Sequence, residues 1–378
     1  MKSISGREKE NYGSQTERKM PDIVLPTVTL FLVTIGTIMI YSSSSIIASE
    51  KFLDEYYFLK RQIVFVFLGL AAMVIMSKIP YLYWQKLAYV GVFVSIILLS
   101  LLLVPGWGVK AGGATRWLKV GSFSFQVTEV VKVALIIFLA HYLTKKREYA
   151  KKFSRIFIVP LTVTALIISL ILFQPDFGTS VIIVMVAMIM FYLAGSRVLH
   201  LTVLASLFIP AAVMLVLGES YRLQRLLSFV DPWKDPTNSG FHIIQSFLSF
   251  GSGGPFGVGI GNGMQKLFYL PEPHTDFILS VIAEEGGFLG VAIILILFTI
   301  LIVRGFMVSF NATDIFGTLL SAGLTTILVL EAFINMAAVM GLVPTKGLVL
   351  PFLSYGGTSL VMSMVAIGII LNISSHRN

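Results

Sequence analysis

The 378-residue chain contains no cysteine and few charged residues. The missing cysteine excludes disulfides, thiolate nucleophiles and cysteine-ligated metal sites. Asp, Glu, Lys and Arg make up 12% of the chain, about half of the roughly 25% found in soluble domains. Hydrophobic residues account for 56%, and the mean hydropathy is +0.88. This composition excludes a water-soluble globular protein and a disordered chain, and it indicates a polytopic membrane protein.

Ten apolar runs are long enough to cross a bilayer, which takes roughly 20 residues per helix. The runs are continuous rather than alternating in polarity, so they predict helices and not the strands of a membrane barrel. The predicted spans are residues 23–46, 62–78, 85–105, 126–144, 155–174, 178–195, 198–218, 276–304, 314–341 and 357–374. We therefore predict an all-α membrane domain over 23–374, with a tail at 1–22 and a short end at 375–378.

The placement of lysine and arginine predicts the orientation, because cytoplasmic loops are enriched in both residues. The tail carries five of them, and the segment 145–155 carries six. With ten spans, both segments lie on one side of the membrane, which then holds 16 of the 28 lysines and arginines. Both termini are therefore predicted to be cytoplasmic. Because the basic residues are scattered between apolar spans, the net charge of +9 does not indicate a nucleic-acid partner.

Polar segments gather at the opposite, extracytoplasmic end, at residues 106–124, 174–179, 219–275 and 341–356. The 57-residue segment between helices seven and eight exceeds ordinary loop lengths. Its aromatic and aliphatic residues can pack, which predicts interfacial or re-entrant helices. Its glycine-rich part, 251–263, would let the backbone approach a ligand closely. This part lacks the G-x-G-x-x-G spacing and any βαβ unit, so we exclude a nucleotide site.

Asp276 stands where the eighth span begins, directly after His274 and Thr275. Thr275 or Asp276 could cap this helix, where the dipole favours a carboxylate. The functional alternative is a carboxylate base at the membrane surface, kept ionised by the N–H donors of the helix end. His274 need not be catalytic, since it could serve in packing or hydrogen bonding.

Ionisable residues inside the spans cost roughly 2.5–3.5 kcal/mol each on insertion scales and are functional candidates by default. Glu129 and Lys132 share a face of the fourth span and can form an ion pair. This pair either locks the bundle or belongs to a proton relay. The roles of Glu284, Glu285 and Glu331 stay open.

Cations on the extracytoplasmic segments could bind a pyrophosphate, for which arginine supplies bidentate contacts and lysine a point charge. The alternative is that their stems cover apolar surface at the membrane interface. The candidates are Arg116, Lys119, Arg222, Arg225 and Lys346.

Six motifs in the same order resemble the SEDS family of bacterial cell-wall polymerases, and the resemblance covers the whole ten-span chain. They are Gly112-Gly-Ala-Thr-Arg-Trp117, Gln174-Pro-Asp-Phe-Gly178, Tyr221–Leu226 with Asp231–Pro236, the segment 245–263, Leu270–Glu285, and Pro344–Gly347 with Leu350–Gly357. The pattern resembles division-type members more than elongation-type members, and sporulation-type members carry nearly the same motifs. Three departures, at Val127, Glu331 and Gly286–Gly287, concern helix packing.

The resemblance implies inverting glycosyl transfer that polymerises lipid II, a disaccharide-pentapeptide on undecaprenyl pyrophosphate. Asp276 matches the catalytic carboxylate of the family. Substrate-binding candidates are Arg116, Arg222, Arg225, Lys346, His274 and Glu272. Glu129 and Lys132 also match positions that the family uses. No cofactor is certain; a divalent cation such as Mg²⁺ could assist, although the sequence has no dedicated metal cage.

The implied partners are a class B penicillin-binding protein, other division proteins and the membrane lipid. The implied location is the bacterial cytoplasmic membrane at the division septum. The rival hypothesis is a flippase that moves lipid II across the bilayer. An enzyme requires a carboxylate at the outer surface and a groove open to lipid, whereas a flippase requires a central polar cavity reached from both sides.

Overall fold

The computed structural model describes residues 20–111, 114–120, 123–149, 152, 156–238, 240–264, 273–345 and 347–376. Their helices and strands are α1 (Val24–Phe52), α2 (Tyr57–Lys78), α3 (Tyr83–Leu101), β1 (Gly108–Ala111), β2 (Ala114–Val120), β3 (Phe123–Gln126), α4 (Val127–Lys145), α6 (Ile158–Leu172), α7 (Phe177–Leu193), α8 (Val198–Leu217), α9 (Ser220–Val230), α10 (Phe241–Gly253), α11 (Ile278–Phe310), α12 (Ile315–Val339) and α13 (Gly357–Ser374). Single 3₁₀ turns lie at Arg147–Tyr149 and Pro232–Lys234.

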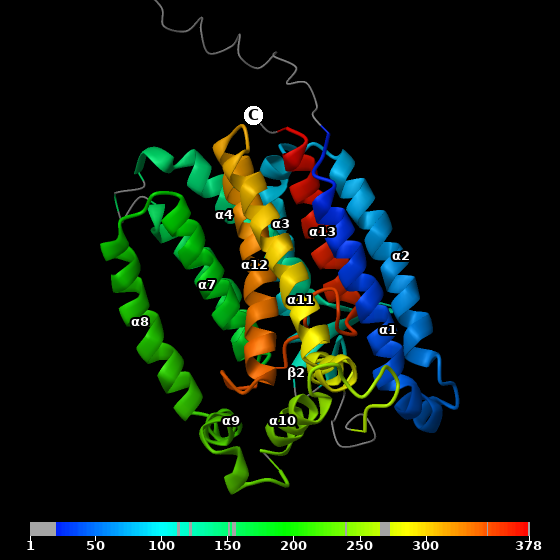
Figure 1. The fold of residues 1–378 in the computed structure, drawn as a ribbon. Coiled ribbons are helices and arrows are strands. Elements are labelled where there is room, and N and C mark those ends of the chain that lie inside the picture. Colours follow the sequence, from blue (N-terminus) through cyan, green and yellow to red (C-terminus); the bar gives the residue numbers. More distant parts are fainter. Residues whose placement is uncertain are drawn as a thin grey trace, which may run out of the picture.

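Each of the ten predicted spans overlaps one apolar helix, so the polytopic helical fold is confirmed. Eight of these helices are long and apolar enough to cross a membrane. The other two, α6 and α7, are also apolar but have 15 and 17 residues. The start of α1 and the C-terminal end of α13 lie at the same end of the bundle (Figure 1). The predicted cytoplasmic location of that end stays a prediction.

The centre of the bundle is formed by α4, α12 and α13, whereas α8 lies at its edge (Figure 1). Of the most apolar 18-residue stretch of α12 and of α13, 83% is buried, whereas 11% of the corresponding stretch of α8 is buried. Small residues allow the central helices to approach closely, as is usual where lipid supplies no hydrophobic contrast. A Cβ on Gly323 of α12 would lie 2.7 Å from Ile136 of α4 and 3.0 Å from Met190 of α7. Helix α8 leaves most of its apolar side chains exposed at the edge of the bundle.

The segment 106–124, predicted only as a polar loop, contributes to a three-stranded antiparallel sheet in the order β1-β2-β3. Trp117 of β2 pairs with Val109 of β1 and with Gln126 of β3. The chain passes from Gln126 directly into α4, and the backbone N–H of Gln126 donates to Oγ1 of Thr358 at the start of α13 (3.1 Å). The sheet is therefore attached to the central helices.

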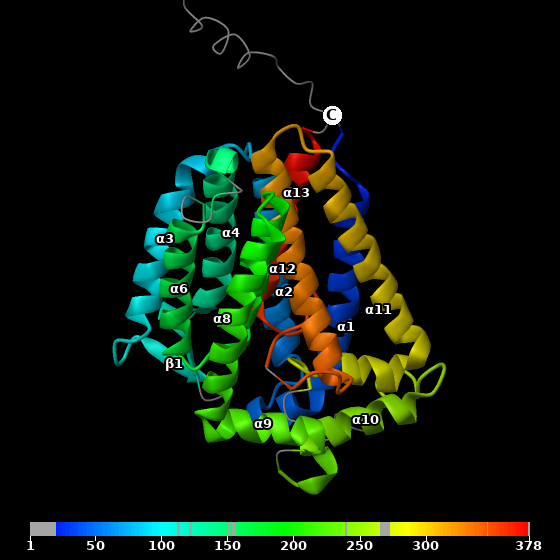
Figure 2. The same ribbon diagram turned by 90° about the vertical axis from the view of Figure 1, so that its left-hand side faces the viewer.

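The segment 219–275 contains two helices, α9 and α10, as its packing residues predict. They lie across the end of the bundle that is opposite the start of α1, roughly perpendicular to the long helices (Figure 2). Of α9, only Ser228 is buried, whereas α10 buries five residues and packs on α11. This end of the molecule thus carries both the sheet and the two transverse helices.

The glycine-rich segment approaches a helix backbone in this structure. Helix α11 is broken at Gly287, where φ is +63°. The freed polar groups pair with the glycine-rich segment: the N–H of Val258 donates to the carbonyl of Glu284 (3.0 Å), and the N–H of Phe288 donates to the carbonyl of Gly254 (2.9 Å). Because buried backbone groups need partners, the segment fixes the shape of α11 near its start.

Candidate active site

Asp276 lies in a turn of residues 273–277 that leads into α11. The helix begins at Ile278, and the residue before it, Phe277, makes no side-chain capping bond. The prediction that Thr275 or Asp276 caps the helix is therefore wrong. In the first turn, the backbone N–H of Ser280 donates to the carbonyl of Phe277 (2.9 Å). The Asp276 side chain is thus not committed to the cap.

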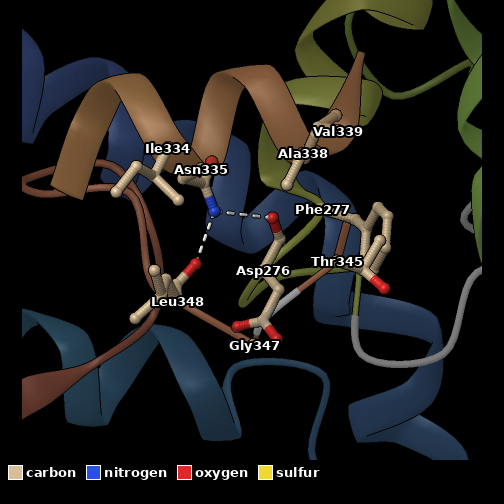
Figure 3. Close-up of a pocket in the computed structure, with 9 residues that line it drawn as sticks. All are labelled: Asp276, Phe277, Ile334, Asn335, Ala338, Val339, Thr345, Gly347 and Leu348. Carbon is tan, nitrogen blue, oxygen red and sulfur yellow. Dashed lines mark hydrogen bonds between the residues drawn. The ribbon is translucent and has the colours of Figure 1, made fainter. Parts of the chain in front are cut away.

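The carboxylate of Asp276 faces a small open pocket between α12 and the segment that follows it (Figure 3). The pocket is small and partly open to solvent. Its lining is mostly apolar and consists of Asp276, Phe277, Ile334, Asn335, Ala338, Val339, Thr345, Gly347 and Leu348. A carboxylate in a mostly apolar, concave site is a typical arrangement for a catalytic base.

Gly347 lies beside the carboxylate of Asp276 in the pocket (Figure 3). Its φ is +63°, and a Cβ built on it would lie 3.2 Å from Oδ2 of Asp276. Figure 3 shows the carboxylate pointing toward this glycine and away from α12. Glycine adopts a positive φ without steric cost, so it allows the chain to turn beside the carboxylate while leaving room for a reactant.

His274 is buried between two aromatic rings. Its ring centroid lies 4.4 Å from that of Phe58 and 5.5 Å from that of Tyr355. Burial, together with the positive charge of Lys51, lowers the pKa of His274 to about 4. The imidazole is therefore neutral at neutral pH and supplies no positive charge to a substrate phosphate. The packing alternative for His274 is the one that this geometry favours.

Two predicted cations lie close to one turn at the start of α7. The Nε atom of Arg116, on β2, is 3.2 Å from Oδ2 of Asp176, so Arg116 already has a buried counter-ion. Arg222, on α9, stacks 5.6 Å from the ring centroid of Phe177 and donates to the carbonyl of Leu215 (2.8 Å). These contacts place both cations at the end of the bundle where the sheet and α9 meet.

Arg225 lies on α9, the helix that also carries Arg222. It lies 6.0 Å from the ring of Tyr221, and its charge lowers the pKa of His242 on α10, although burial is the larger cause. The His242 ring in turn stacks on Phe277, with centroids 5.8 Å apart. Through His242, helix α10 thus contacts the residue that follows Asp276. Lys346 and Glu272, the other substrate-binding candidates, lie outside the described residues.

The Glu129–Lys132 pair predicted from the fourth span is present, with Nζ of Lys132 2.8 Å from Oε1 of Glu129. Glu331 of α12 also pairs with Lys132, which the sequence alone did not reveal. All three residues are at most 6% exposed. A small neighbouring cavity is lined, apart from Lys132, by apolar side chains. The pair is therefore part of a closed three-residue cluster that joins α4 to α12.

Glu284 and Glu285, whose roles the sequence left open, lie near the start of α11, and both accept hydrogen bonds. Oε2 of Glu285 accepts a hydrogen bond from Ser42 of α1 (2.7 Å), and Oε1 of Glu284 accepts one from the backbone of Met264 (2.7 Å). Both side chains are buried. They hold α1 and the glycine-rich segment against α11. Within the described ranges, no three acidic or histidine side chains are grouped as metal ligands.

Comparison with known proteins matches this fold and sequence to one family. The family model FTSW_RODA_SPOVE, described as a cell cycle protein, matches residues 23–378. A protein of Geobacter metallireducens named probable peptidoglycan glycosyltransferase FtsW is 44% identical over 355 residues, covering 94% of this chain and 95% of the relative. Stage V sporulation protein E of Bacillus subtilis is 40% identical over 361 residues, covering 96% and 99%.

Two solved structures share the fold. One, from a study of how a peptidoglycan synthase complex coordinates polymerization and crosslinking, has a TM-score of 0.77 and 28% identity over 94% of this chain and 97% of that one. The rod shape determining protein RodA of Thermus thermophilus has a TM-score of 0.71 and 26% identity over 94% and 97%. The chain therefore belongs to the SEDS family of polytopic membrane proteins, to which FtsW, RodA and the sporulation protein belong.

Proposed function

We propose that this peptidoglycan glycosyltransferase polymerises lipid II with Asp276 as its general base, during septal wall synthesis in cell division. The observation that carries the proposal is the position of the Asp276 carboxylate, which faces an open pocket at the end of the bundle that carries the sheet and α9. Relatives that cover nearly the whole chain are named peptidoglycan glycosyltransferases. The division role is the finer part of the proposal, because a sporulation protein is nearly as similar.

In the proposed reaction, Asp276 accepts the proton of the acceptor sugar 4-hydroxyl. That oxygen attacks C1 of the donor sugar from the opposite face, and undecaprenyl pyrophosphate leaves with inversion. A base must lie within hydrogen-bond reach of the proton that it removes, and the carboxylate is accessible from the pocket. The chemistry requires Asp276 to be ionised, and the adjacent Gly347 leaves space for the sugar hydroxyl.

The leaving pyrophosphate requires positive charge, which stabilises the transition state as the charge develops. We assign this role first to Arg222 and Arg225, since both lie on the weakly buried helix α9. Lys346 remains a candidate. Arg116 contributes less directly, because its buried counter-ion Asp176 neutralises it. Glu272 and His274 remain candidates for contacts to the sugar or peptide.

The flippase hypothesis requires a polar path through the bundle. In the described part of the bundle interior, Glu129, Lys132 and Glu331 are buried and paired with one another. The buried Glu284 and Glu285 of α11 are hydrogen-bonded to Met264 and Ser42. The cavity next to Lys132 is otherwise apolar. These observations favour an enzyme that works at one end of the bundle over a transporter.

From the distribution of lysine and arginine, we place the end that carries the sheet and α9 on the outer side of the cytoplasmic membrane, and both termini in the cytoplasm. We further propose a class B penicillin-binding protein as the partner, since the solved relative with a TM-score of 0.77 comes from a peptidoglycan synthase complex. Other division proteins would recruit the pair to the septum. A divalent cation such as Mg²⁺ could add charge at the pyrophosphate.

The test is glycan polymerisation from purified lipid II by the enzyme co-purified with its cognate transpeptidase. Wild type is compared with D276A and with D231N, which changes an exposed aspartate of the segment after α9. We expect polymer from wild type and D231N and none from a folded D276A. Equal polymer from D276A would refute the base assignment. Lipid II translocation by the same proteins in liposomes, without polymer, would support the flippase instead.

A further inference from the structure

Three consecutive backbone carbonyls of the Asp276 turn are each held by a hydrogen bond from a distant part of the chain. The carbonyl of His274 accepts from the N–H of Tyr355 (2.8 Å), and that of Thr275 accepts from Oγ of Ser354 (2.6 Å). The carbonyl of Asp276 itself accepts from Nδ2 of Asn335 (3.0 Å), as Figure 3 shows. The backbone that carries the base is therefore fixed at three successive residues.

Asn335 holds both sides of the pocket at once. Its Nδ2 atom also donates to the carbonyl of Leu348, one residue after Gly347 (Figure 3). The side chain is 3% exposed, and its Oδ1 atom is buried without a hydrogen-bond partner. A buried unpaired carbonyl costs roughly 1–3 kcal/mol, and an apolar side chain at this site would avoid that cost. The packing of α12 alone would therefore favour an apolar side chain over asparagine at position 335.

Ser354 has a similar double role on the other side of the turn. While it donates to Thr275, its Oγ accepts a hydrogen bond from the N–H of Leu350 (2.8 Å). The side chain is 4% exposed. A single hydroxyl thus ties the Asp276 turn to the segment that precedes α13.

We propose that Asn335 and Ser354 are positioning residues for glycosyl transfer: they hold the Asp276 carboxylate and Gly347 at a fixed separation across the pocket. The inference rests on the proposed function of Asp276. Neither residue is assigned a contact with substrate. A misplacement of about 1 Å at a reacting group can cost about 100-fold in rate, so the loss of either tie lowers kcat more than it changes KM.

The test compares N335L with N372L in the full-length enzyme with its transpeptidase. Asn372 is a matched control at the opposite end of the bundle: it is 2% exposed, donates to the carbonyl of Ser77 (2.8 Å) and accepts from the N–H of Tyr81 (2.8 Å). Both substitutions remove a buried bridging amide. We expect both to lower the Tm, but only N335L to lower kcat, by about 10- to 100-fold, with little change in KM for lipid II.

A second pair keeps the inference testable if N335L does not fold. S354A removes the hydroxyl, whereas S354T retains it, so S354A should lower kcat and S354T should restore most of it. A wild-type kcat for N335L or S354A, or an equal loss of kcat in N335L and N372L, would overturn the inference. The D276A result separates the two proposals: an inactive D276A with an unaffected N335L and S354A refutes only the positioning role.

Discussion

Lys132 of α4 and Glu331 of α12 form an ion pair in the interior of the bundle, and Glu129 binds the same ammonium group from one turn away. The cluster holds two carboxylates and one cation at sites that are at most 6% exposed. Because Asn335 lies one turn after Glu331, this cluster fixes the helix that contacts the Asp276 turn.

We expect K132M to destabilise the protein far more than E331Q. The first change leaves two buried carboxylates without their cation, which costs roughly 3–5 kcal/mol for a broken buried pair. The second leaves the Glu129–Lys132 pair intact. Thermal unfolding in one detergent measures the difference. Equal Tm values for the two variants would contradict this difference, and Tm values equal to that of wild type would show that the cluster does not stabilise the bundle.

The space beside Asp276 gives a second prediction, for G347A. Alanine at this position adopts an unfavourable positive φ, and its Cβ presses on the carboxylate from 3.2 Å. The matched control is G195A, since Gly195 has a φ of +88° with no atom within 4 Å of the added Cβ. Both should lose about 1–3 kcal/mol of stability, but only G347A should lose polymerase activity. Similar activity in both variants would contradict the proposed pocket geometry.

Variants of Arg116 and Arg225 should differ in their effects on Tm and on KM. R116A leaves Asp176 buried without its cation, so we expect a lower Tm together with lower activity. R225A removes an exposed guanidinium and should raise KM for lipid II with no change in Tm. Thermal unfolding and steady-state kinetics on the same preparations test this. A lower KM or an unchanged KM in R225A would remove Arg225 from the pyrophosphate site.

The buried His274 predicts a pH dependence of stability. Its pKa falls from 6.5 when free to about 4 in the folded protein, so the unfolded chain binds the proton more tightly. The contribution of His274 to the free energy of unfolding is therefore fully present above about pH 6.5. It falls by roughly 3 kcal/mol as the pH is lowered toward 4. H274F keeps an aromatic ring but cannot titrate, so its Tm should fall less than that of wild type between pH 6.5 and 4. Parallel curves would contradict the shifted pKa.

The sequence predicts well what depends on local composition. Ten continuous apolar runs gave ten helices, and the spacing of Glu129 and Lys132 gave their ion pair. The same reasoning expected helices in the long segment 219–275, where α9 and α10 lie. Each of these features is determined by residues within a few turns of one another.

Features that depend on distant segments were not predicted. Glu331 meets Lys132 across 199 residues, and Asn335 meets Asp276 across 59. The strands of residues 108–126 are too short for a clear alternation of polarity. The cap alternative for Asp276 is wrong, because α11 begins two residues later, at Ile278.

The most direct test of the account is the isosteric variant D276N, with lipid II binding and polymerisation measured on the same folded preparation beside wild type. Asparagine preserves the shape of the side chain but cannot accept the proton from the sugar hydroxyl at neutral pH. The account predicts lipid II affinity close to that of wild type and no glycan polymer. Polymer formed by D276N at the wild-type rate would contradict the assignment of Asp276 as the base.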